Sequence, residues 1–166
     1  MKKFRKGFTL VELLIVILII GILAANVSLI NKKATSSAKV STIVNNLNTL
    51  KTAGMLYYMD HMYSKDTEMT TDSLMKTSPD YLGDAAKGMI AYGYGVATVT
   101  NQPKKWYVYY NLNHDTVQSD PDITDIKSKL AAQASTSGLL GDTAAPGTKA
   151  ITAVYTNQNY VLLQVR

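Results

Sequence analysis

Residues 8–30 read FTLVELLIVILIIGILAANVSLI, and this almost uninterrupted apolar run decides the fold of the chain. As a helix, its 23 residues would extend over about 34 Å, which is enough to cross a hydrocarbon layer of about 30 Å. Four basic residues precede it, and positive charge before a membrane segment predicts a cytoplasmic N-terminus. We therefore expect a single-pass membrane helix near the start of the chain.

Length and flanking charge leave two interpretations of this segment open. A secretory signal peptide would share the basic start, and residues 24–28 include small side chains that could offer a cleavage site, but the run is long for a signal peptide. A membrane anchor fits the length better. Neither explains Glu12, because a carboxylate costs up to about 3 kcal/mol at the bilayer centre and less near its edge. Glu12 either reaches the membrane interface or meets a positive partner inside a protein assembly.

The composition excludes several classes of function. The formal net charge is +5, but Lys2, Lys3, Arg5 and Lys6 supply four of the 17 basic side chains, so 13 remain against 12 acidic ones. The basic character thus belongs to the first residues and does not indicate a nucleic-acid-binding domain. The chain has no cysteine, which removes disulfides, thiol chemistry and cysteine-based metal sites.

Residues 6–25, KGFTLVELLIVILIIGILAA, resemble the N-terminus of type IV pilins and the related pseudopilins. The resemblance covers the basic leader, Gly7, the aromatic Phe8, the acidic Glu12 and the aliphatic run with Gly21. It implies that a prepilin peptidase cuts after Gly7 and methylates the new amine of Phe8. It also implies that Glu12 pairs with the Phe8 amine of a neighbouring subunit. Since the cut creates a cation, the two charges would neutralise each other in the low dielectric of a helix bundle.

The resemblance also implies a cellular route and a set of partners. The subunit would wait in the cytoplasmic membrane, with its N-terminus inside, until an assembly platform extracts it into an extracellular filament. Its partners would be further copies of itself, other pilins, the prepilin peptidase and that platform. No cofactor is expected. Many Gram-negative pilins close a C-terminal loop with a disulfide, so the absence of cysteine favours the Gram-positive branch of the family.

One position departs from the family pattern. Many pilins carry a proline about two-thirds along the apolar segment, where this chain has Leu29, and its first proline is Pro79. We therefore predict a more continuous helix, because proline is the strongest helix breaker. Gly21 is the remaining weak point, and it would serve either close helix packing or local melting.

The pattern after residue 30 predicts an α+β head. Apolar residues recur every three or four positions up to about residue 63, which indicates that the helix continues with one face suited to cover a sheet. Alternation over 88–100 and 104–115 predicts two strands, 119–134 a short inserted helix, and 150–156 with 160–166 a hairpin. In the first strand, Gly93, Gly95 and their small neighbours form one face, which we expect to lie under the long helix. The result would be a long helix packed on an antiparallel sheet of about four strands.

The predicted organisation therefore has four parts. They are a cleaved leader (1–7), a membrane and filament-core helix (8–30), the amphipathic half of the helix (31–63) and a globular head packed on that half (64–166).

The head offers few candidate sites. Asp120, Asp122 and Asp125 could hold calcium through hard oxygen ligands, as C-terminal regions of related pseudopilins do, but capping of the inserted helix also explains them. Lys104 and Lys105 stand beside Trp106 and Tyr107, which suits single-strand binding or, more simply, a protected strand edge. The two histidines, His61 and His114, lie in no catalytic motif, so we do not expect an enzyme.

These observations favour a structural subunit, major or minor, of a type IV pilus that serves adhesion, surface motility or biofilm formation. The alternative from the same family is a pseudopilin of a type II secretion or DNA-uptake machine. A third possibility is a membrane-tethered binding domain that does not polymerise, which would keep residues 1–7 and would not need Glu12.

Overall fold

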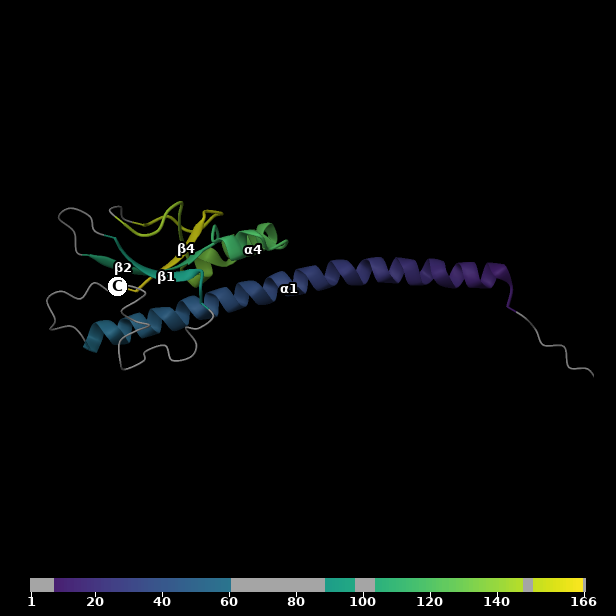
Figure 1. Ribbon diagram of the computed structural model, residues 1–166, viewed down its shortest axis with the longest axis horizontal. Helices are drawn as coiled ribbons and strands as arrows, with labels where there is room; N and C mark the ends of the chain where they lie inside the picture. Colours follow the sequence, from purple (N-terminus) through teal and green to yellow (C-terminus); the bar gives the residue numbers. More distant parts are fainter. Residues whose placement is uncertain (1–7, 61–88, 98–103, 148–150, 166) are drawn as a thin grey trace, which may run out of the picture. The chain divides into compact units, whose positions relative to one another are not determined.

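The structure, a computed structural model, describes residues 8–60, 89–97, 104–147 and 151–165, and only the backbone of residues 25–33 (Figure 1). The leader predicted at 1–7 and the end of the helix predicted at 61–63 lie outside these ranges. The chain divides into two compact units, residues 1–35 and residues 36–166. The second, called here the head unit, contains the sheet.

A single helix dominates the fold. Helix α1 spans Leu10–Asp60 without a break, which confirms the prediction drawn from the absence of proline. A side chain added at Gly21 would meet no other atom within 4 Å, so this glycine is not required by any contact within the described part of the chain. The other helices among the described residues are α3 (Asp115–Gln118) and α4 (Ile123–Ser137).

Four antiparallel strands form the sheet of the head unit, which confirms the predicted α+β class. They are β1 (Tyr92–Ala97), β2 (Lys105–Asn111), β3 (Leu140–Asp142) and β4 (Tyr160–Gln164). Their order across the sheet is β1-β2-β4-β3, and every neighbouring pair is antiparallel.

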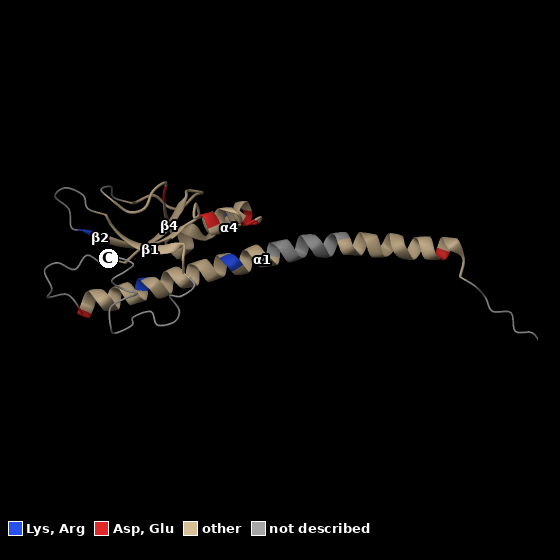
Figure 2. Ribbon diagram, viewed as in Figure 1, with Lys and Arg blue, Asp and Glu red and all other residues tan. Residues whose placement is uncertain are grey.

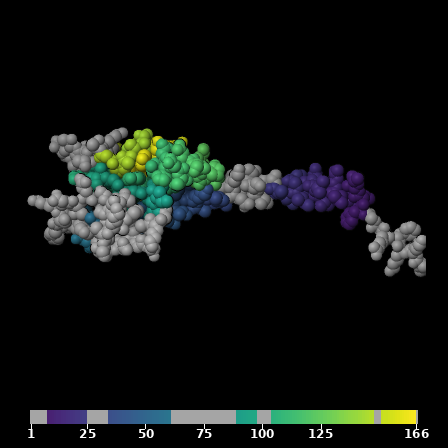
Figure 3. Space-filling view, viewed as in Figure 1, coloured from purple at the N-terminus to yellow at the C-terminus, as the bar shows by residue number. Residues whose placement is uncertain are grey.

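The main core lies between one face of this sheet and two helices. From residue 36 onward α1 turns a buried stripe of residues three or four apart toward the sheet: Val40, Ile43, Leu47, Leu50, Ala53 and Tyr57. Helix α4 adds Ile126, Leu130 and Ala134 to the same core. In the space-filling view, α4 (green) lies directly beside this part of α1 (blue) (Figure 3). The amphipathic periodicity of the sequence therefore has its expected consequence here.

The prediction about the two faces of β1 is wrong. The tyrosine face, not the glycine face, lies toward α1: the Tyr94 hydroxyl donates to the Leu50 carbonyl at 2.5 Å, and the Asn46 amide donates to the Tyr92 hydroxyl at 3.1 Å. A tyrosine ring can fill the space between sheet and helix while its hydroxyl satisfies a polar group there.

The small residues of β1 serve the opposite face. A side chain at Gly93 would come within about 2.5 Å of the Tyr109 ring, and one at Gly95 within 2.8 Å of the Pro146 ring. A second, smaller core lies on this face, formed by Ala97, Tyr107, Ile151 and Leu162. The glycines therefore make room for side chains of the same sheet and its loop, not for the long helix.

The predicted C-terminal hairpin is also wrong in its pairing. Strand β4 pairs with residues 140–142, for which no strand was predicted, and residues 151–155 form no regular strand. That segment lies on the other side of β3, where it makes an isolated bridge from Val154 to Leu140 and accepts a 2.9 Å bond from Gly141. A side chain at Gly141 would come within 3.0 Å of the Tyr155 backbone, so this close approach favours glycine.

The assignment of the β1 faces can be tested by removing one hydroxyl group. We expect Tyr94→Phe to lower the free energy of unfolding by about 1 kcal/mol, because a buried hydrogen bond to α1 is lost. Tyr109→Phe is the matched control on the opposite face, since its hydroxyl makes no hydrogen bond within the described residues. Denaturant unfolding of both variants in detergent is the measurement, and equal stabilities would contradict the assignment.

Candidate functional site

The first candidate site is the start of α1, where Thr9 and Glu12 bind each other. The Glu12 carboxylate oxygen Oε2 accepts two hydrogen bonds of 2.8 Å, one from the Thr9 backbone N–H and one from its hydroxyl. The Glu12 N–H in turn donates to the Thr9 hydroxyl oxygen at 3.3 Å. This reciprocal arrangement is a capping box, in which a threonine before the helix and a glutamate three residues later satisfy each other's backbone N–H groups. Glu12 therefore has a bonded role within its own chain.

The spacing that reveals this role was present in the sequence. A Thr-x-x-Glu pattern before an apolar run is the signature of a capping box, and residues 9–12 match it. From the sequence we expected Glu12 either to reach the membrane interface or to meet a positive partner in an assembly, and we did not predict a bond within its own chain. Phe8 directly precedes the capping box and is 85% exposed. Gly7, the predicted cleavage residue, lies outside the described residues.

The apolar side chains that follow are exposed within the described part of the chain. From Phe8 to Leu23 every large hydrophobic side chain is at least 48% exposed. Glu12 is the only charged residue among residues 8–24, and it lies at the start of the helix (Figure 2). Among the described residues, no helix combines the length and the apolarity needed to cross a membrane. Residues 25–30 of the predicted span lie outside the described side chains.

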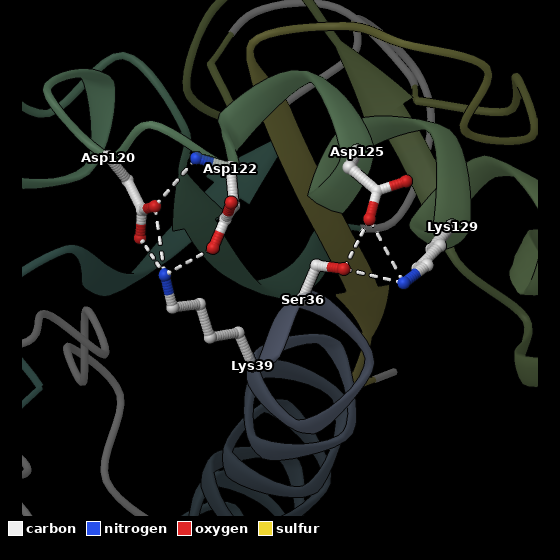
Figure 4. Close-up of polar contacts among 6 residues, drawn as sticks. All are labelled: Ser36, Lys39, Asp120, Asp122, Asp125 and Lys129. Carbon is white, nitrogen blue, oxygen red and sulfur yellow. Dashed lines mark hydrogen bonds and ion pairs between the residues drawn. The ribbon is translucent and has the colours of Figure 1, made fainter. Parts of the chain in front are cut away.

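The second candidate site joins α1 to the loop before α4. Lys39 of α1 donates to both carboxylate oxygens of Asp120, at 2.8 and 2.9 Å, and to Asp122 at 3.1 Å (Figure 4). Hydrogen bonds from Lys39 lower the pKa of Asp120, and the bond to Asp120 raises the pKa of Lys39. A single lysine thus stands where a cation between Asp120 and Asp122 would stand.

The third predicted calcium ligand, Asp125, belongs to a separate group. It accepts a hydrogen bond from Ser36, which is fully buried in α1, and a 3.0 Å ion pair from Lys129 one turn further along α4. Lys129 also donates to Ser36 at 2.5 Å and to Ser37 at 2.9 Å. The three carboxylates are therefore divided between two lysines, Asp120 and Asp122 with Lys39 and Asp125 with Lys129. No group of three or more metal-ligating side chains gathers among the described residues.

Helix capping, the simpler interpretation of these acids, is only partly right. Asp122 holds the N-cap position of α4, but its side chain makes no capping bond. Asp120 instead accepts the Asp122 backbone N–H at 2.9 Å, which orders the turn before the helix. Sequence reasoning missed Lys39 because it lies 81 positions away from Asp120.

The aromatic residues beside Lys104 and Lys105 do not form an open stacking surface. Tyr107 is fully buried in the smaller core, and its hydroxyl donates to the Ile151 carbonyl at 3.2 Å. Trp106 packs against the main core and meets the Tyr58 ring edge-on at 6.5 Å between centroids. Base stacking needs an exposed ring face, so these contacts favour the strand interpretation over single-strand binding. The His114 ring lies 2.9 Å from the Thr116 hydroxyl, and His61 lies outside the described residues.

Comparison with known proteins places the first site in a recognised signal. Residues 2–25 match the family model of the prokaryotic N-terminal methylation motif. No curated protein and no solved structure matches the chain. The matched residues are a type IV prepilin-like signal, and this match supports a pilin-like or pseudopilin-like precursor. Such a signal implies processing by a prepilin peptidase and, in general terms, pilin assembly.

The ion pairs between α1 and the α4 loop give a stability prediction. Lys39→Met should lower the free energy of unfolding by about 0.2–1 kcal/mol, the range for ion pairs at a protein surface. The pKa of Asp120 is lowered in the folded state from its ordinary value of 3.8. The ion pair therefore stabilises the wild-type fold at pH values above 3.8, and this stabilisation is lost as the pH falls below 3.8 and through the lowered pKa.

Unfolding experiments from pH 7 to pH 3 would check both statements. The variant should lose less stability on acidification than the wild type, because it lacks the contribution that acid removes. Lys51→Met is a suitable control, since this α1 lysine makes no hydrogen bond or ion pair in the part of the chain described. An unchanged acid slope in Lys39→Met would show that the pair contributes nothing.

Proposed function

We propose that this protein is a structural subunit, major or minor, of a type IV pilus. A prepilin peptidase cuts after Gly7 and methylates the Phe8 amine, and the subunit then assembles into a helical filament on the cell surface. The filament serves adhesion, surface motility or biofilm formation. The methylation motif over residues 2–25 supports the processing steps. The observation that carries the assembly step is the apolar start of α1, which has no cover of its own.

The exposed apolar surface of residues 8–24 is more stable in an apolar environment than in water. Burial of apolar surface is favourable by about 25 cal/mol per Å², so residues 8–24 would enter a membrane before assembly and a bundle of like helices afterwards. Transfer from lipid to a helix bundle gains less, because lipid is already apolar, and tight packing and polar contacts must then supply the preference for the filament. Gly21 suits such packing, because no other atom in the described part of the chain lies within 4 Å of a side chain added there.

Glu12 would provide the decisive polar contact. After the cut, the Phe8 amine of one subunit is a cation at the start of its helix, and the Glu12 carboxylate of a neighbour is an anion at nearly the same depth. Attraction between the two charges is strong in a low dielectric, and a charge left unpaired there is heavily penalised. The pair would therefore fix the axial register of neighbouring subunits as well as neutralising both charges.

The alternative within the same family is a pseudopilin of a type II secretion or DNA-uptake machine. The methylation motif is common to both, so the alternative rests on the same residues 2–25. A membrane-tethered binding domain is the third candidate, and it predicts an uncut N-terminus. The head unit, with its four-stranded sheet and two cores among the described residues, fits any of these architectures.

The capping box makes Glu12→Gln the sharpest test of the charge pair. A glutamine can still accept the Thr9 N–H, so the helix start is kept, while the negative charge is lost. We expect Glu12→Gln to be inserted, cut and folded normally but to give at least tenfold fewer sheared filaments, because a buried amine is left without its anion. Quantification of filaments per processed chain is the measurement.

Glu12→Ala is the comparison variant, since it removes both the cap and the charge. Comparable losses in Glu12→Gln and Glu12→Ala would assign the defect to the charge. Normal filament yield from Glu12→Gln, with a defect only in Glu12→Ala, would show that Glu12 acts as a helix cap and that the pairing is wrong.

A further inference from the structure

We propose that Thr9 is a positioning residue for assembly, holding the Glu12 carboxylate so that one oxygen caps the helix while the other is free for a neighbour's amine. This inference rests on the proposed function, because it concerns the pair between Glu12 and Phe8. It assigns a role to a residue that the processing steps themselves leave unexplained.

The geometry separates the two carboxylate oxygens of Glu12. Both hydrogen bonds from Thr9 end on Oε2, each at 2.8 Å. Within the described residues Oε1 accepts no hydrogen bond, and it is exposed with the rest of the side chain. An ionised carboxylate has about four acceptor positions, so Oε1 can accept an ammonium while Oε2 keeps both bonds from Thr9. Capping and pairing are therefore compatible in one side-chain conformation.

The same contacts place the carboxylate at the cut end of the chain. The Thr9 N–H that Glu12 accepts belongs to the peptide linking Phe8 to Thr9. The nitrogen released by a cut after Gly7 is that of Phe8, one residue away. Glu12 is thus already turned toward the end of the helix where amines would gather in a bundle of processed subunits.

Fixing this side chain in advance lowers the cost of pairing. A free glutamate gives up rotamer entropy worth up to about 1.5–2 kcal/mol when it is immobilised. Two bonds from Thr9 hold Glu12 in place before a neighbour arrives, so less ordering remains to be done on association. The Thr9 hydroxyl provides one of these bonds and also accepts the Glu12 N–H, so the side chain of Thr9 determines the conformation.

A purely structural role for Thr9 would be weak. Helix α1 has 51 residues, and an N-cap contributes about 1 kcal/mol to a helix, which matters for short helices far more than for one of this length. Glycine is nearly as good an N-cap as threonine, yet it has no hydroxyl with which to hold Glu12. Substitution by glycine therefore distinguishes capping from positioning.

Three full-length variants test the inference: Thr9→Ser, Thr9→Val and Thr9→Gly. Serine keeps the hydroxyl and should give filament yields within about twofold of the wild type. Valine and glycine remove it, and each should lower the yield about fivefold or more, the change expected for loss of one hydrogen bond of about 1 kcal/mol. Yields are counted per chain whose N-terminal peptide mass shows the cut after Gly7, so that effects on processing are excluded.

The outcomes separate this inference from the proposed function. If Thr9→Gly assembles as well as the wild type, or better, Thr9 does not position Glu12 and the inference fails. If Thr9→Val fails while Thr9→Gly does not, the cap alone matters, and the inference also fails. If Glu12→Gln assembles normally, the charge pair itself is wrong. Loss in Thr9→Val, Thr9→Gly and Glu12→Gln, with rescue in Thr9→Ser, supports both.

Discussion

The constraint on which the rest depends is that the first turns of α1 pack against nothing else in the described part of the chain. Large apolar side chains from Phe8 to Leu23 are about half exposed or more, and contact of this exposed apolar area with water is unfavourable. A helix surface that faces water usually carries several charged side chains, whereas residues 8–24 carry a single carboxylate, which is bonded to Thr9. In the proposed function, a membrane and then a bundle of like helices cover this segment, which agrees with the prepilin-like signal.

The apolar side chains in the second half of the same helix are buried by the head unit. From Ser36 onward, α1 covers one face of the sheet, and polar contacts to α4 and the turn before it hold the helix at the point where this cover begins. Lys39 and Ser36 each reach carboxylates of the segment between β2 and the middle of α4 (Figure 4). Along α1, exposed apolar side chains before residue 24 thus give way to a stripe that is buried against the head unit from residue 40 onward.

The sequence was sufficient for the features that depend on local patterns. The absence of proline predicted an unbroken helix, and periodicity predicted which half of α1 covers a sheet. The errors arose where a partner far along the chain decides the outcome. The glycines in β1 indicated close packing, but the sequence did not show whether α1 or Tyr109 would occupy the space beside them. Strand β3 was not predicted, because its three residues lie in a stretch with the composition of a loop. From the sequence, helix capping was a sufficient explanation for Asp120, but in the structure its carboxylate also accepts a hydrogen bond from Lys39, 81 positions away.

The most direct test of the central claim is the N-terminal mass of this protein in filaments sheared from the cell surface. We predict a chain that begins at Phe8, carries one methyl group on its amine and has lost residues 1–7. The abundance of this processed chain in the filaments would then separate a major subunit from a minor one. A chain that still begins at Met1, or one cut further along near Ala25, would contradict the account.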